Sequence, residues 1–287
     1  MGDRSAIEWT DATWNPVTGC SHVSEGCRHC YAETLSLRMG WSKKPWTAPN
    51  SAENVVLHPD RLDQPLRWRT PRRIFVNSMS DLFHEQIPDE FIDRVFKRMQ
   101  RARQHIFQIL TKRPQRMRDY LMSQVPVPWG GFSFPEPWGK HIWMGVSVED
   151  QRAADERIPL LVNTPAAVRF ISAEPLLGPI NLGVVGSGPW RNALTGCGYR
   201  AGPHGIEHMD QVRPLDWVIV GGESGHGARP MDAAWARSIR DQCVAAGIPY
   251  FFKQWGGRAA KAGGRELDGR TWDEMPRKMV SRRQSPG

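Results

Sequence analysis

Three of the five cysteines lie within eleven residues near the N-terminus, at positions 20, 27 and 30. Thiolates bind iron and zinc, and three of them in one loop can each hold one iron of a 4Fe-4S cluster. The fourth iron of such a cluster is then free to bind a small molecule. An odd number of cysteines fits poorly with a set of disulfides. The Cys-x6-Cys-x2-Cys spacing therefore indicates a metal or cluster site at Cys20, Cys27 and Cys30.

Two other interpretations of this loop remain open. A structural zinc site needs a fourth ligand, for which the sequence offers His22, His29 or the distant Cys197 with His204. No second Cys-x2-Cys pair is present to complete a zinc ribbon. The remaining interpretation is a set of buried, unreactive thiols, which does not explain why they cluster among glycines and polar residues.

The elements that must position this loop follow from short apolar runs. They predict strands at 74–76, 106–110, 142–146, 168–171, 217–220 and 249–252, with a first strand near 12–18. Helical patterns at 89–103 and 232–246 lie between some of them. Strands that alternate with helices form parallel sheets. We therefore expect an α/β fold, namely a complete or partial (β/α) TIM-type barrel with parallel strands and long rim excursions.

Polar residues follow nearly every predicted strand. Because the carboxyl ends of parallel strands meet at one edge of the sheet, these side chains are expected to share one binding site. The alternative is that each one caps the next helix or begins a turn. The residues concerned are Ser78, Ser80, Asp81, Lys112, Ser147, Glu149, Glu174 and Glu223.

The chain is organised as one domain with two long excursions. We assign residues 1–257 to a single barrel domain, interrupted by excursions at 41–73 and 183–214, and residues 258–287 to a polar C-terminal tail. The 287 residues and 40% apolar content exclude a disulfide-stapled miniprotein. The longest stretches without charge are short and interrupted by proline and glycine, so we expect no membrane span and a cytoplasmic protein.

The net charge of +8 is concentrated in two places. Residues 94–118 contain nine Lys or Arg and no Asp or Glu, which favours phosphate binding, although a merely soluble surface is an alternative. In the first excursion, tryptophans alternate with Lys and Arg as they do in base-stacking surfaces. These tryptophans are Trp41, Trp46 and Trp68.

The cysteine motif and the strand ends together resemble the radical S-adenosylmethionine (SAM) superfamily. The pattern is closest to an uncharacterised, phage-associated three-cysteine-motif family that is related in pattern to spore photoproduct lyase. The resemblance covers residues 5–257 and is carried by WNPVTGCSHVSEGCRHCYAE, FVNSMSDLFHEQIP, QILTKRP, WMGVSVEDQ, RFISAEPLLGPI, DWVIVGGESGHGARPM and PYFFKQWG. Two features depart from the superfamily: the first spacing is six residues instead of three, and His29 precedes the third cysteine where an aromatic ring is common.

This resemblance implies that Cys20, Cys27 and Cys30 bind a 4Fe-4S cluster whose open iron chelates SAM. A reductant such as flavodoxin or ferredoxin would supply the electron that cleaves SAM, and the 5′-deoxyadenosyl radical would abstract a substrate hydrogen. By position, the resemblance implies that the SAM amino group is held by Ser78, Ser80 and Asp81. The resemblance also implies that Lys112 binds the SAM carboxylate or a phosphate. Ser147 and Glu149 would bind the ribose, and Glu174 and Glu223 would bind the ribose or the substrate.

The function expected from the sequence is thus a radical-SAM-type iron-sulfur enzyme that modifies or repairs a nucleic acid or nucleotide. Cys197 and Tyr199, in the second excursion, are candidate hydrogen-atom donors, whereas Cys243 is expected in the core. The rival hypothesis is a non-catalytic zinc- or cluster-binding module that holds nucleic acid. The many polar strand ends favour the enzyme, because a binding module does not need so many groups facing one pocket.

Overall fold

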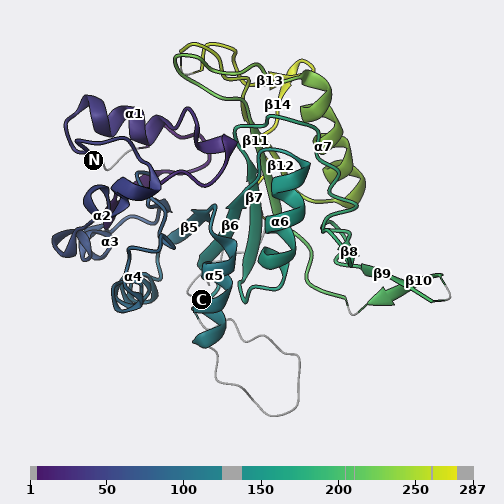
Figure 1. The fold of residues 1–287 in the computed structure, drawn as a ribbon, viewed down its shortest axis with the longest axis horizontal. Coiled ribbons are helices and arrows are strands. Elements are labelled where there is room, and N and C mark those ends of the chain that lie inside the picture. Colours follow the sequence, from purple (N-terminus) through teal and green to yellow (C-terminus); the bar gives the residue numbers. More distant parts are fainter. Residues whose placement is uncertain (1–4, 125–137, 204, 210, 260, 277–287) are drawn as a thin grey trace, which may run out of the picture.

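The computed structural model describes residues 5–124, 138–203, 205–209, 211–259 and 261–276. Its centre is a seven-stranded parallel sheet curled into a half-barrel (Figure 1). The strands lie in the order β1 (Ala12–Trp14), β4 (Arg73–Val76), β5 (Ile106–Thr111), β6 (Ile142–Ser147), β7 (Val168–Ala173), β11 (Trp217–Gly221) and β12 (Tyr250–Gln254). This order confirms the prediction of an α/β fold with parallel strands, in the form of a partial (β/α) barrel.

Four helices follow strands of the sheet and pack on its convex face. They are α4 (Asp89–Arg101), α5 (Pro114–Ser123), α6 (Gln151–Val162) and α7 (Ala233–Ala246). The apolar residues of α4 recur at helical spacing and are buried, as the sequence predicts. The predicted ends of α7 are also confirmed, because the Asp232 carboxylate caps its first turn and Gly247 ends it with a left-handed φ of 68°.

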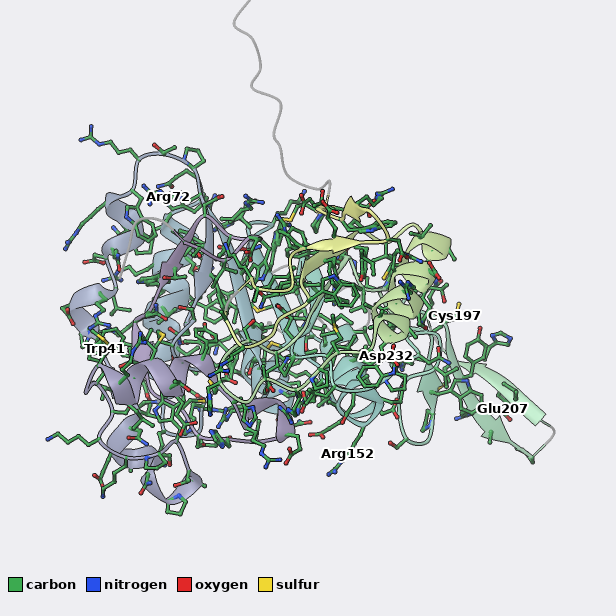
Figure 2. All side chains as sticks on the ribbon, turned by 90° about the horizontal axis from the view of Figure 1, so that it is seen from above. Trp41, Arg72, Arg152, Cys197, Glu207 and Asp232 are labelled. Atoms are coloured by element: carbon green, nitrogen blue, oxygen red, sulfur yellow. The ribbon has the colours of Figure 1, made fainter. Side chains whose placement is uncertain are left out.

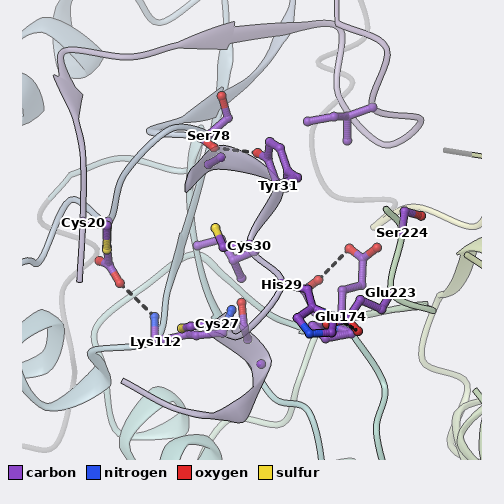
Figure 3. A pocket seen from close by; sticks show the side chains of 18 of the residues that line it. Cys20, Cys27, His29, Cys30, Tyr31, Ser78, Lys112, Glu174, Glu223 and Ser224 are labelled. Atoms are coloured by element: carbon purple, nitrogen blue, oxygen red, sulfur yellow. Dashed lines mark hydrogen bonds and ion pairs between the residues drawn. The ribbon is translucent and has the colours of Figure 1, made fainter. Parts of the chain in front are cut away.

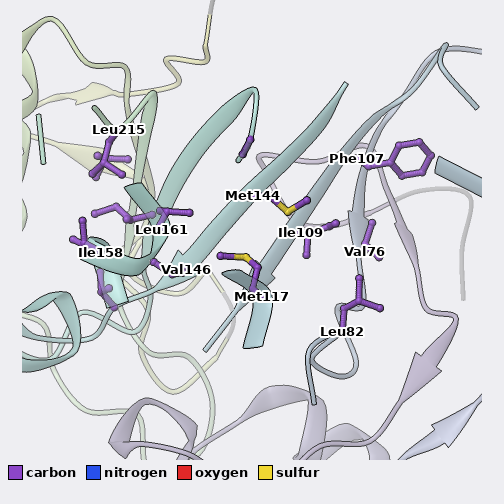
Figure 4. Packing of buried hydrophobic residues seen from close by; sticks show 14 of the residues in the cluster. Val76, Leu82, Phe107, Ile109, Met117, Met144, Val146, Ile158, Leu161 and Leu215 are labelled. Carbon is purple, nitrogen blue, oxygen red and sulfur yellow. The ribbon is translucent and has the colours of Figure 1, made fainter. Parts of the chain in front are cut away.

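The two faces of the sheet bury different kinds of side chain. The convex face packs aliphatic residues such as Ile109, Met144 and Val146 against the helices (Figure 4). The second core cluster, on the other face of the strands, is largely aromatic and includes a tryptophan from the N-terminal segment, Trp9, whose ring centroid lies 4.8 Å from that of Phe75. Since successive side chains of a strand point to opposite faces, the alternation along each strand produces both layers.

A glycine in β6 makes the aromatic layer possible. A Cβ atom at Gly145 would lie 2.5 Å from ring atoms of Phe170 on the neighbouring strand β7. Only a residue without a side chain allows this ring to lie flat across β6.

The excursion at 41–73 is built from short elements: η2 (Ala48–Asn50), α2 (Ser51–Asn54), β3 (Val56–Leu57), η3 (Pro59–Arg61) and α3 (Gln64–Arg67). Strand β3 pairs with β2 (Val17–Thr18), which leads into the cysteine loop. Trp46 and Trp68 are buried here, at 2% and 7% exposure, and only Trp41 is exposed. The prediction of a base-stacking surface is therefore wrong for Trp46 and Trp68, whose rings help to fix the excursion to the barrel.

The excursion at 183–214 forms a separate three-stranded antiparallel sheet of β8 (Trp190–Arg191), β9 (Gly198–Gly202) and β10 (Gly205–Met209). It projects from the side of the domain (Figures 1 and 2).

Within the segment predicted as a polar tail, β13 (Glu266–Leu267) and β14 (Arg270–Thr271) form a hairpin. Leu267 and Trp272 of this segment belong to the main core, a packing that its polar composition does not indicate. No helix in the described segments combines the length and apolar character needed to cross a bilayer.

Replacing Gly145 by alanine is expected to lower the free energy of unfolding by about 1–3 kcal/mol, because the new methyl group collides with Phe170. Urea denaturation measures this change. In a Phe170→Leu background the same glycine substitution is expected to cost much less, since the ring atoms are gone. An equal cost in both backgrounds would contradict the proposed close approach.

Candidate functional site

A cavity of about 500 Å³ lies at the carboxyl ends of the parallel strands and is bordered by the cysteine loop. Its size is that of a small-molecule site. In Figure 3, Cys20, Cys27 and Lys112 lie on one side of the view, and Glu174 and Glu223 lie on the other. The predicted site residues that line it are Cys20, Cys27, Cys30, Ser78, Ser80, Asp81, Lys112, Ser147, Glu174 and Glu223.

The three cysteines of the loop are free thiols. Gly19, which precedes the first of them, has a φ of 85°, and a Cβ atom there would lie 1.8 Å from the carbonyl oxygen of Asn54. Glycine is required at this point because the chain passes so close to the excursion. A backbone bridge between Gly19 and Ser80 joins the loop to the segment after β4. The start of the loop is therefore fixed to the carboxyl edge of the sheet.

For two of the three thiols, those of Cys20 and Cys30, the environment favours the protonated form when no metal is bound. Burial and the nearby Asp81 carboxylate raise the pKa of Cys20 to about 12. Burial also raises the pKa of Cys30, although backbone N–H groups of Ala32 and Glu33, in the first turn of α1 (Tyr31–Arg38), donate hydrogen bonds to its sulfur. A coordinating metal ion deprotonates its thiol ligands, so metal binding would convert the thiols of Cys20 and Cys30 to thiolates.

A buried guanidinium, that of Arg113, ties the loop to the ends of two strands. Its Nη1 lies 3.3 Å from Oδ2 of Asp81 and 3.5 Å from the sulfur of Cys20, and its Nη2 donates to the backbone oxygen of Ser21. Its Nε donates to Glu85 at 2.9 Å. The Asp81 carboxylate also accepts hydrogen bonds from Thr111 and from the backbone N–H of Lys112. Asp81 therefore borders the cavity, but its oxygens are used to position the loop.

A second ionic network holds the other side of the loop. The Glu223 carboxylate accepts hydrogen bonds from Arg229 at 2.6 and 2.9 Å, and His29 Nδ1 lies 3.2 Å from it. Arg229 also donates to the backbone oxygen of Glu25. Burial raises the pKa of Glu223, but the hydrogen bonds from Arg229 outweigh it, and the net pKa is below the usual range. Glu223 is thus an ionised carboxylate that fixes the loop as well as a cavity residue.

Within the described residues, no three His, Cys, Asp or Glu side chains are placed to hold a single metal ion. Of the two histidines proposed as zinc ligands, His22 is hydrogen-bonded to Glu33 at 2.5 Å, whereas His29 lines the cavity and its Nδ1 lies 3.2 Å from Glu223 without a hydrogen bond among the described residues. Cys197 lies just before β9 in the projecting sheet and, like Tyr199, does not line the cavity. His204 lies outside the described residues. Neither the zinc ligand set nor the hydrogen-donor role proposed for Cys197 and Tyr199 has support in this geometry.

Glu149, assigned to the ribose from sequence, does not line the cavity. Its carboxylate accepts a 2.8 Å hydrogen bond from Arg157, and both side chains are less than 5% exposed. Burial raises the pKa of Glu149, but Arg157 keeps it below the usual range. This glutamate is buried in the ion pair with Arg157 after β6, and its carboxylate lies against the cysteine loop, where a Cβ atom at Gly26 would be 3.1 Å from it.

The cavity also contains polar residues that the sequence analysis did not assign. Lys253, at the end of β12, forms a 2.9 Å ion pair with Glu174. Asn77, at the end of β4, has a φ of 59°, is 2% exposed, and has no hydrogen-bond partner for either amide atom among the described residues. Tyr31 donates a 2.5 Å hydrogen bond to the backbone oxygen of Ser78. An asparagine just after a buried strand is a usable sequence signal, since asparagine tolerates positive φ.

The basic run at 94–118 is not a single unopposed patch. Arg98 pairs with Asp63, Arg116 with Asp89, and Arg113 with Asp81 and Glu85. Of the nine basic residues only Lys112 and Arg113 line the cavity. Acidic residues outside the run therefore neutralise several of its charges, and phosphate binding by the run stays a prediction.

Comparison with known proteins identifies a family. A family model described as "Protein of unknown function (DUF5131)" matches residues 4–276. No curated protein and no solved structure matches the chain.

Arg157→Met is expected to lower the free energy of unfolding by about 3–5 kcal/mol, because it leaves the buried Glu149 carboxylate unpaired. In the double variant E149Q/R157M the loss is expected to be much smaller than the sum of the two single losses. Urea denaturation of all four proteins tests this, and strictly additive losses would contradict the pairing.

The stability is also expected to depend on pH through His84. Burial, together with Arg113, lowers the pKa of His84 to about 4 from a usual 6.5. Between these values the unfolded chain binds a proton that the folded protein does not, so the free energy of unfolding falls as the pH drops from 6.5 to 4. His84→Gln is expected to flatten this dependence. Identical pH profiles of the two proteins would contradict the assignment.

Proposed function

The chain belongs to the DUF5131 family of proteins of unknown function, and we propose that it is a radical-SAM-type iron-sulfur enzyme. It reductively cleaves S-adenosylmethionine and abstracts a hydrogen atom from its substrate, a nucleic acid or nucleotide that it modifies or repairs. The observation that carries this proposal is that three free thiols and the polar ends of the parallel strands border one cavity.

The donor set suits a cluster better than a single ion. A single zinc ion needs four ligands at about 2.0–2.3 Å from one centre, and the described residues contain no three suitable side chains around one point. A 4Fe-4S cluster instead binds each cysteine through a different iron, so three thiols around a cavity can serve it. Cys20, Cys27 and Cys30 would hold it, and the open side of the cavity leaves room for SAM.

The bound cluster and SAM would supply an electron transfer that yields methionine and a 5′-deoxyadenosyl radical. The residues of the chain would bind and orient SAM and the substrate. The Lys112 side chain lines the cavity, where its positive charge also acts on Cys30 and Glu149, and it can meet a carboxylate or phosphate. The hydroxyls of Ser78, Ser80 and Ser147 retain acceptor lone pairs for an ammonium or for ribose hydroxyls. Below them the aromatic layer with Trp9 and Phe75 excludes water from the reaction.

The proposal extends to the surroundings of the enzyme. The half-barrel is taken as a variant of the TIM-type barrel, and the electron is taken to come from a reductant such as flavodoxin or ferredoxin. We also propose that the reaction takes place in the cytoplasm, where thiols remain reduced, and that the protein is associated with phage.

The rival function is a non-catalytic zinc- or cluster-binding module for nucleic acid. It is less favoured because polar side chains from six strand ends face the same cavity.

Anaerobic iron-sulfur reconstitution followed by reduction with dithionite in the presence of SAM is expected to release 5′-deoxyadenosine. Cys27→Ala is expected to reduce this product to background, because one iron loses its ligand. Cys243→Ala is the matched control, since Cys243 is buried in the helix core away from the cavity. Purification with zinc and no release of 5′-deoxyadenosine would support the binding module instead.

A further inference from the structure

Exposed apolar side chains are concentrated beside the cysteine loop. Eleven large hydrophobic residues are exposed in the described part of the chain, and five of them fall between positions 23 and 41. Isolated exposed apolar residues are ordinary, whereas a local group beside a cavity marks an interaction surface. The five residues are Val23, Tyr31, Leu37, Met39 and Trp41, with exposures of 39–54%.

This surface begins at the mouth of the cavity. Val23 and Tyr31 both line the cavity and are themselves exposed. The opposite face of α1 is buried, because Ala32 packs with Trp46 and Met79 in a small core cluster. Trp41 follows α1, where its backbone N–H donates to the Ser36 oxygen and folds the turn back on the helix. The exposed face of α1 and the turn after it, residues 31–44, form what we call the α1 platform.

The α1 platform is positively charged. Arg38 and Lys43 are exposed and have no acidic partner among the described residues, and Lys44 pairs with Glu53. The one acidic residue of the segment, Glu33, is only 12% exposed in its side chain and accepts hydrogen bonds from His22 and from the backbone of Trp46. The platform therefore offers cations and aromatic rings together, with no free acid.

We propose that the α1 platform binds single-stranded nucleic acid. Proteins that hold single strands combine basic side chains along the backbone with aromatic side chains on which bases stack. Tyr31 and Trp41 are the exposed rings, and Arg38 and Lys43 are the phosphate contacts. In a duplex the bases are already stacked on one another and do not reach these rings. If the proposed enzyme acts on the bound strand, its substrate is single-stranded. This step, from a bound strand to a substrate, rests on the proposed function.

The basic surface of α4 does not have this combination. Its cations include Lys97 and Arg101, but Phe91 and Phe96 of the same helix are buried in the core. It offers charge without stacking, so its contribution to binding is expected to be weak and non-specific. The α1 platform and α4 each contain one lysine and one arginine that can be neutralised together, so the two surfaces can be compared at equal change of charge.

Fluorescence anisotropy with a labelled oligonucleotide of about 12 nucleotides tests the proposal, a length within the range that such sites cover. The single strand is expected to bind more tightly than the duplex of the same sequence. Trp41→Ala is expected to weaken binding by roughly tenfold, as the loss of one stacked base does. Ile206→Ala, at an exposed residue of the projecting sheet, is the control and is expected to change nothing.

The charge test compares two double variants. In R38Q/K43Q the slope of log K against log salt is expected to fall by about 1.4, since each phosphate contact to a single strand contributes roughly 0.7. In K97Q/R101Q it is expected to stay nearly unchanged. Equal effects of the two double variants, tighter binding of the duplex, or no binding at low salt would each overturn the proposal. Displacement of the strand by polyglutamate at equal charge concentration would point to an acidic protein partner and would also overturn it.

The measurement is made on the metal-free and on the reconstituted protein, which separates it from the proposed chemistry. Strand binding that depends on Trp41, without 5′-deoxyadenosine formation, supports the platform and contradicts the proposed reaction. Release of 5′-deoxyadenosine by a protein that binds no single strand contradicts the platform alone.

Discussion

The position of the cysteine loop depends on one buried guanidinium. Arg113 lies after β5, its partner Asp81 lies after β4, and Ser21 and Cys20 belong to the loop that crosses above both. A buried charge is tolerated only when its hydrogen-bonding capacity is satisfied, and here two carboxylates and the loop backbone do so. The same interactions that make the burial of Arg113 tolerable therefore fix the first cysteine over the sheet.

The half-barrel provides the surface over which Arg113 fixes the first cysteine. Its inner face is filled by aromatic rings, which Gly145 and the N-terminal Trp9 allow to pack closely. The cavity is lined by polar side chains from the carboxyl ends of the strands and by apolar side chains such as Trp9, Phe75 and Leu110, so it has an apolar floor and a polar, partly charged rim. The Glu223–Arg229 network holds the second side of the loop. The three thiols thus lie in a loop that is held from two directions above an apolar floor, which suits chemistry that must exclude water.

The sequence was sufficient for the parts of the fold governed by local periodicity. The seven strands and the helices α4 and α7 follow from apolar runs and from end signals such as Asp232 and Gly247. The convergence of the strand ends follows from the geometry of parallel sheets. What the sequence could not supply were pairings between distant segments. Asp63 and Asp89 neutralise arginines of the basic run, Arg157 binds Glu149 away from the cavity, and Trp46 and Trp68 turn inward.

The central claim is that Cys20, Cys27 and Cys30 together hold a cluster of several irons. Anomalous scattering at the iron edge, from crystals of the anaerobically reconstituted protein, tests it most directly. The account predicts iron density beside the cavity, bonded to all three sulfurs through three different irons, with a fourth iron that has no protein ligand. A single zinc peak, or iron bonded to fewer than three of these sulfurs, would contradict it.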